Sequence, residues 1–192
     1  AYNAPYYQMV KSAGNSRGDG LNTGDGGYDL LVGASTAKNV LVIAAASKTL
    51  DFTGPGSVGM SSFSSWGPTD DGRIKPDISA KGVAMYSSVG DADDSYANYN
   101  GTSMSAPNTT GSLILLQQHY NNLNGNYMLS STLRGLAIHT ADEAGANPGP
   151  DYSFGWGLLN IERGAEVISN NGTSSLIIEE EIQNGEVYTF TV

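Results

Sequence analysis

Cysteine is absent from the 192-residue sequence. Without a thiol, the chain can form neither a disulfide nor a thiolate metal site, and it has no cysteine nucleophile. The absence does not fix the cellular compartment, because secreted proteins can also lack cysteine. Nucleophilic chemistry, if the chain performs any, must therefore use another side chain.

Basic residues are scarce: nine Lys and Arg stand against 19 Asp and Glu, for a net charge of -10. Nucleic acids and anionic membranes bind basic patches, so we predict neither as a partner. No stretch approaches the roughly 20 apolar residues of a membrane helix. The first residues also lack the basic and apolar stretches of a signal peptide, and the sequence does not start at Met. We expect a processed or excised piece.

Hydrophobic patterning predicts an α/β fold with a mainly parallel sheet. Residues 40–46 are a continuous apolar run, typical of a strand buried on both faces. Residues 102–120 are predicted to form a helix, and because apolar side chains nearly encircle it, we expect it to be buried. Ser130 and Asn160 are predicted to cap two further helices. The other predicted segments are strands at 7–12, 83–88, 175–178 and 187–192 and helices at 130–138 and 161–169.

The most specific motif is residues 101–107, Gly-Thr-Ser-Met-Ser-Ala-Pro, at the start of the predicted long helix. A serine there lies beside free backbone N–H groups and the positive end of the helix dipole. Negative charge that develops on a substrate carbonyl oxygen would be stabilised at this place. An isolated serine at this position would more often be a simple helix cap, so the whole heptapeptide carries the interpretation of Ser103 as a nucleophile.

This heptapeptide resembles the nucleophile motif of the subtilisin-like serine proteases (subtilases, peptidase S8). Residues 10–15, Val-Lys-Ser-Ala-Gly-Asn, resemble the strand that ends in the family's oxyanion-hole asparagine, here Asn15. The resemblance extends over residues 7–169. Its other segments are Phe-Ser-Ser-Trp-Gly-Pro at 63–68 and Lys-Pro-Asp-Ile at 75–78, both interpreted as structural, and the closing segment at 151–160.

The resemblance implies a serine endopeptidase that hydrolyses polypeptides through an acyl-enzyme, with Ser103 as nucleophile and Asn15 as oxyanion donor. It implies that substrate also contacts Ser12, Ala13, Gly14 and Thr102. It further implies a partial three-layer subtilisin-like fold for residues 1–170, the C-terminal part of a catalytic domain. Residues 171–192 are expected to be a short β tail or the start of a second β domain. Because the family is usually secreted, we expect an extracellular or periplasmic location.

Two positions depart from the family's pattern. Lys81 stands where proline is usual, and Asn108 stands where histidine is common. Neither position is used in catalysis, so only local geometry is affected.

A base for Ser103 is missing from the sequence. A serine nucleophile needs a base, and the base needs an orienting group. In the family both the Asp and the His precede the oxyanion asparagine, but the 14 residues before Asn15 contain neither. His119 lies about 24 Å from Ser103 along a continuous helix, far beyond hydrogen-bond reach. His139 is near Asp142, but a histidine interacting with the helix end is the favoured interpretation. We therefore expect this fragment to be inactive alone.

The sequence is also compatible with two alternative functions. One is a pseudoprotease that binds peptides without catalysis, and another is a structural or carbohydrate-binding domain carried by the tail. A truncated sheet would expose an edge, so we predict self-association. We predict no metal site and no cofactor, although two groups of carboxylates could ligate Ca²⁺ and are more simply solvated turns. These groups are Asp19, Asp25 and Asp29, and Asp91, Asp93 and Asp94.

Overall fold

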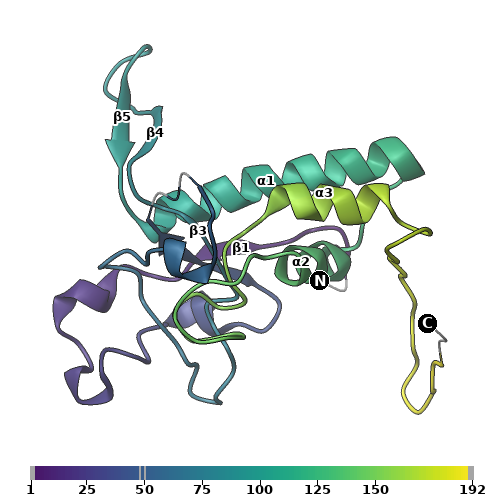
Figure 1. Ribbon diagram of the computed structural model, residues 1–192, viewed down its shortest axis with the longest axis horizontal. Helices are drawn as coiled ribbons and strands as arrows, with labels where there is room; N and C mark the ends of the chain where they lie inside the picture. Colours follow the sequence, from purple (N-terminus) through teal and green to yellow (C-terminus); the bar gives the residue numbers. More distant parts are fainter. Residues whose placement is uncertain (1–2, 48, 50, 190–192) are drawn as a thin grey trace.

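A three-stranded parallel sheet forms the centre of the computed structural model, which describes residues 3–47, 49 and 51–189 (Figure 1). The strands are β1 (Val10–Ser12), β2 (Leu41–Ala46) and β3 (Ile78–Lys81), in the order β1-β2-β3. The register places Ile43 of β2 beside Ser12 on one side and Ile78 on the other. Every residue of β2 is buried, as expected for a central parallel strand covered on both faces. The predicted α/β fold class is confirmed.

Helices cover one face of this sheet and loops cover the other. α1 (Thr102–Asn124) crosses all three strands, and α3 (Ile161–Ser169) and α2 (Ser130–His139) pack beside it (Figure 1). Alternate residues of β2 point to opposite faces. Leu41 and Ile43 therefore join the helices in the main core, whereas Val40 and Val42 meet the loops. The helices contribute Leu113, Leu116, Leu133, Leu136, Ala137 and Ile168 to the main core.

The helix boundaries largely follow the sequence signals. The predicted cap of α3 is confirmed, because Asn160 Oδ1 accepts a hydrogen bond from the Arg163 N–H at 3.0 Å. α2 also starts at the predicted place, but Ser130 is its first residue and no side chain caps it. α1 continues one turn further than expected and ends at Asn124, and the following Gly125 has a φ of 74°, which allows the chain to leave the helix.

The prediction that α1 is buried all around was wrong. Leu113 and Leu116 are buried, but the adjacent Ile114 and Leu115 are 62% and 64% exposed. Successive helical residues are 100° apart, so a helix lying on a sheet buries one side only. In the described part of the chain, no element covers the opposite side of α1.

A second, antiparallel pair of strands projects from the body near the N-terminal end of α1 (Figure 1). It consists of β4 (Met85–Ser88) and β5 (Tyr96–Tyr99). The strand predicted at 83–88 is thus confirmed, but it lies in a hairpin and not in the parallel sheet. β3 and β5 were not predicted, because turn-forming residues lie on both sides of each strand.

The early tail stays against the helices, with Ile177 packed on the main core, whereas residues 180–189 are all exposed and extend away from it (Figure 1). The Leu129 N–H donates to Glu179 Oε1 at 2.8 Å, which holds the early tail against the start of α2. The predicted turn at Asn184–Gly185 is present, but described residues 175–189 form no strand. Residues 190–192 of the last predicted strand lie outside the described residues. No helix in the described residues is long and apolar enough to cross a membrane.

A buried ion pair stabilises the amino end of β2. Lys75 Nζ donates to the Val40 carbonyl at 2.7 Å and to Asp77 Oδ2 at 2.5 Å, and Asp77 Oδ2 also accepts the Val42 N–H at 2.6 Å. Removal from water is the main influence on both groups: burial raises the pKa of Asp77 and lowers the pKa of Lys75. The Lys-Pro-Asp segment therefore has contacts that match its structural interpretation.

The closing segment packs directly on this region. The Trp156 N–H donates to the Asp77 carbonyl at 2.9 Å. The Gly157 carbonyl accepts both the N–H and the hydroxyl of Ser79, at 2.8 and 2.9 Å. Two segments that are some 80 residues apart in sequence are thus one structural unit beside β3.

Candidate active site

Ser103 lies at the carboxyl edge of the sheet, where open α/β sheets place their ligands. It is the second residue of α1, and its side chain is exposed. β1 leads into Asn15 at this edge. β3 leads into Gly82, whose carbonyl accepts the Gly101 N–H at 2.8 Å. The turn before Ser103 is therefore fixed to the end of the sheet.

The side-chain amide of Asn15 has a defined orientation. Its Oδ1 accepts the Thr102 N–H at 3.0 Å and the Thr102 hydroxyl at 2.8 Å. A backbone N–H can only donate, so the oxygen of the amide must face Thr102. The two N–H bonds of Asn15 Nδ2 consequently point away from Thr102. The Thr102 hydroxyl also accepts the Gly14 N–H at 3.2 Å, which links the two segments once more.

The nitrogens of two N–H groups border the space beside Gly101. A Cβ atom placed on Gly101 would lie 3.4 Å from Met104 Sδ, 3.6 Å from Asn15 Nδ2 and 3.6 Å from the Ser103 backbone nitrogen. The first amides of a helix have no acceptor within the helix, so the Ser103 N–H is available for a ligand. Glycine keeps this space open. An anionic oxygen bound there would have both N–H groups as nearby donors beside the Ser103 side chain, which is what an oxyanion hole requires.

Ser65 holds the turn that carries Asn15. Its N–H donates to the Gly14 carbonyl at 2.8 Å, and its hydroxyl accepts the Ser16 N–H at 3.0 Å. Gly14 has a φ of 113°, and a Cβ atom there would lie 2.9 Å from Ser65 Oγ. The sequence predicts only a loop-shaping role for the Phe-Ser-Ser segment and does not indicate its contact with the turn that carries Asn15. The contact spans about 50 residues of sequence, so no local pattern indicates it.

The predicted substrate-contacting residues all lie at this edge, but they present different groups. The side chains of Ala13 and Thr102 are buried, so these residues position their neighbours from inside the protein. The Ala13 N–H donates to the Ile43 carbonyl at 3.0 Å and extends the parallel ladder. Ser12 and Gly14 are partly exposed, and the Ser12 carbonyl accepts the Ser35 hydroxyl at 3.1 Å.

Neither histidine of the chain lies at the N-terminal end of α1. His119 is near the other end, with its Nε2 2.8 Å from Ser169 Oγ of α3. His139 ends α2 and lines a hollow with Val167 of α3. Asp142, which sequence reasoning considered beside His139, contacts Asn160 at 2.8 Å and Arg163 at 3.2 Å. The described residues therefore bring together Ser103 and Asn15, the predicted nucleophile and oxyanion donor, and place neither histidine beside them.

Two other sets of predicted features are the acidic groups and the two departures from the family pattern. Within residues 3–47, 49 and 51–189, no three potential ligands among His, Cys, Asp and Glu are grouped to hold a metal ion, and this covers both acidic clusters named above. The two departures from the family pattern contact each other: Asn108 Nδ2 donates to the Lys81 carbonyl at 3.4 Å. This contact lies one turn along α1 from the nucleophile.

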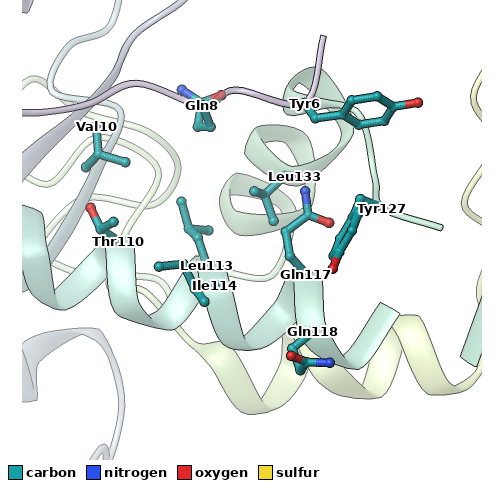
Figure 2. Close-up of a pocket in the computed structure, with 10 residues that line it drawn as sticks. All are labelled: Tyr6, Gln8, Val10, Thr110, Leu113, Ile114, Gln117, Gln118, Tyr127 and Leu133. Atoms are coloured by element: carbon teal, nitrogen blue, oxygen red, sulfur yellow. The ribbon is translucent and has the colours of Figure 1, made fainter. Parts of the chain in front are cut away.

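A hollow of about 260 Å³ lies elsewhere, between the N-terminal segment and α1 (Figure 2). Tyr6, Ile114, Tyr127 and Leu133 line it together with amide and hydroxyl side chains. Gln117 already uses its amide on the backbone of Met128, at 2.9 Å in both directions. The lining contains no histidine, carboxylate or cation, so this hollow has no chemistry comparable to that at Ser103.

The comparisons with known proteins agree with the site. The sequence profile of the subtilase family matches residues 7–157, well over half of the chain. The C5a peptidase of Streptococcus pyogenes serotype M3 is 41% identical over 116 residues, which are 60% of this chain and 9% of that protein. The PII-type proteinase of Lactococcus lactis subsp. cremoris is 31% identical over 147 residues, covering 69% of this chain and 8% of that protein.

Solved structures share the fold. The CspB protease of Clostridium perfringens superposes with a TM-score of 0.63 at 24% identity, covering 75% of this chain and 30% of that one. The prenylagaramide maturation protease PagA gives a TM-score of 0.59 at 22% identity, covering 83% and 50%.

The protein is thus of the subtilisin-like protease class. The chain belongs to the subtilase family, which confirms the resemblance noted from its motifs. It spans less than a tenth of the length of the curated relatives named above.

Proposed function

We propose that Ser103 is the nucleophile of a serine endopeptidase and that Asn15 Nδ2 and the Ser103 N–H bind the oxyanion. One observation carries the proposal: the nitrogens of both donors lie 3.6 Å from the position of a Cβ atom added to Gly101, with Met104 Sδ at 3.4 Å, and the adjacent Ser103 is exposed. Preorganised donors of this kind stabilise the tetrahedral intermediate of acyl transfer, and loss of one typically costs about 3–4 kcal/mol.

The proposed reaction follows from these positions. Ser103 Oγ attacks the carbonyl carbon of a peptide bond, and the carbonyl oxygen takes up negative charge between the two donors. The amine leaves with a proton, and water then hydrolyses the ester on Ser103. The hydroxyl proton needs a base, which the described residues do not place beside Ser103. We infer that a histidine and a carboxylate from a longer polypeptide complete the site.

The substrate class and location are part of this proposal. The proteases named above are relatives in sequence or fold, which supports polypeptides as substrates. We also propose that the protein acts outside the cytoplasm, since secretion is usual in the family. Release to the medium or periplasm, measured with a tagged copy in the native host, tests this part.

Fluorophosphonate labelling tests the assignment of Ser103. Such a probe reacts at an enzyme-like rate only with a serine that has both a base and an oxyanion hole. We expect the 192-residue chain to react no faster than its Ser103→Ala variant. We expect fast labelling at Ser103 in the longer natural polypeptide, and a loss of about 10²–10³ in rate with Asn15→Leu.

A matched control is Ser112→Ala, also on α1, which should leave the labelling rate unchanged. If the longer polypeptide is folded but labels no faster than its Ser103→Ala variant, the chain is a peptide-binding pseudoprotease, the alternative raised by the sequence. Fast labelling of the 192-residue chain itself would show that a base has been overlooked.

A further inference from the structure

The β4–β5 hairpin has two open faces. The main contacts of its strands are with each other, and it stands clear of the sheet and helices (Figure 1). On one face, Tyr86 and Tyr96 are 68% and 57% exposed. A two-stranded hairpin that packs on nothing is marginally stable in water, so these faces are suited to receive a partner.

Both ends of the hairpin are fixed to the turn that precedes the nucleophile. The Gly82 carbonyl accepts the Gly101 N–H at 2.8 Å. The Ala84 N–H donates to Asn100 Oδ1 at 2.7 Å. A molecule bound along the hairpin is therefore held at a defined distance from Ser103.

The tyrosine face has a particular chemistry. Tyr86 pairs with Asn98 and Tyr96 pairs with Ser88, so the two rings are diagonal neighbours on one face. They stack with centroids 5.5 Å apart and planes 23° from parallel. The outer faces of such rings attract Lys and Arg side chains. Aromatic rings in this arrangement therefore favour a cationic partner over an anionic one.

The hairpin is negatively charged, which also favours a cationic partner. Its tip carries Asp91, Asp93 and Asp94, all exposed, and residues 85–99 contain no Lys or Arg. Anionic partners such as nucleic acid are repelled by this tip, whereas a basic polypeptide is attracted.

We propose that the tyrosine face and acidic tip of this hairpin bind a Lys- or Arg-containing segment of the polypeptide substrate. The proposal rests on the function proposed for Ser103. From Asp94 to Gly101 there are seven residues, or about 23 Å at the rise of a strand. An extended substrate of the same rise places its basic side chains about five to seven residues from the scissile bond.

Direct binding tests the proposal without catalysis. The probe is a fluorescein-labelled nonapeptide with Arg at alternate positions, measured by polarisation on the 192-residue chain carrying Ser103→Ala. Asp91→Asn/Asp93→Asn/Asp94→Asn should weaken binding at least fivefold. The matched control Asp19→Asn/Asp25→Asn/Asp51→Asn changes the net charge equally at exposed positions elsewhere, and should stay within twofold.

The aromatic face is tested in the same assay. Tyr86→Ala/Tyr96→Ala should weaken binding, and Tyr86→Phe/Tyr96→Phe should retain it, because the rings remain. Equal loss in both Asp triples would overturn the proposal by showing a diffuse charge effect, and so would equal affinity for the peptide with Glu in place of Arg. Fluorophosphonate labelling reports separately on Ser103, so each proposal can fail without the other.

Discussion

Replacement of Lys75 by Met should destabilise the chain strongly at neutral pH and much less in acid. Lys75 is 3% exposed and its amine contacts Asp77, so the substitution leaves a buried carboxylate without its counter-charge. Breaking a buried pair from one side typically costs about 3–5 kcal/mol. The Val42 N–H still donates to Asp77, but one hydrogen bond does not replace the cation.

The pH dependence follows from the direction of the pKa shift. Burial raises the pKa of Asp77 above its ordinary value, while the charge and hydrogen bond of Lys75 lower it. Without Lys75, the pKa of Asp77 rises further. A carboxyl with a raised pKa adds stability in its neutral form. That stability is fully present below the pKa of the unfolded chain and is lost as pH rises through the folded-state pKa. Each pKa unit is worth about 1.4 kcal/mol.

Urea unfolding at pH 4.5 and pH 8 measures this difference. We expect Lys75→Met to lose about 3–5 kcal/mol at pH 8 and at least about 1.4 kcal/mol less at pH 4.5. Lys75→Met/Asp77→Asn should recover most of the loss at pH 8, because a neutral amide can still accept the Val42 N–H. Lys38→Met, at an exposed lysine, should stay within about 0.5 kcal/mol. An equal loss at both pH values would refute the reasoning.

Three other predictions concern the fold. Gly157→Ala should cost at least about 2 kcal/mol in urea unfolding, because φ is 122° and the new Cβ would overlap the Asp142 carbonyl oxygen. Its matched control Gly111→Ala, within α1 and with nothing within 4 Å, should instead gain about 1 kcal/mol. Asn160→Ala should cost about 1 kcal/mol through the lost cap of α3, and an unchanged midpoint would contradict this. The uncovered face of α1 should make the chain self-associate in light scattering, where a monomer at all concentrations would count against it.

Local sequence signals were sufficient to predict an element when the residues of that one segment determine its structure. The apolar run of β2 and the Asn160 cap of α3 both appear as the sequence indicated. The exposed side of α1 could not be predicted, because its apolar residues look like core residues in the sequence. The sequence does not show whether another element covers them. The strands β3 and β5 were missed because turn-forming residues lie directly on both sides of each strand.

Ser103 and Asn15 were predicted as active-site residues by resemblance, whereas the contacts that position them were not predicted. Ser103 and Asn15 each belong to a motif that can be recognised in sequence. The Thr102 hydroxyl contacts Asn15 across 87 residues of sequence, and the Ser65 hydroxyl contacts Ser16 across 49 residues. Such contacts form only when the sheet and α1 have brought these distant segments together. A single sequence contains no local pattern that indicates them.

The two hydrogen-bond networks lie at opposite ends of the parallel sheet. Lys75 and Asp77 contact the amino end of β2, at Val40 and Val42. Asn15 and Ser103 lie beyond the carboxyl ends, about 20 Å away for a strand of six residues. Sites more than about 10 Å apart with no shared partner usually act additively. The ion pair therefore determines how firmly the sheet is held, whereas Gly101, Thr102 and Ser65 determine where the donors point. A change at the first network can lower stability without moving the second.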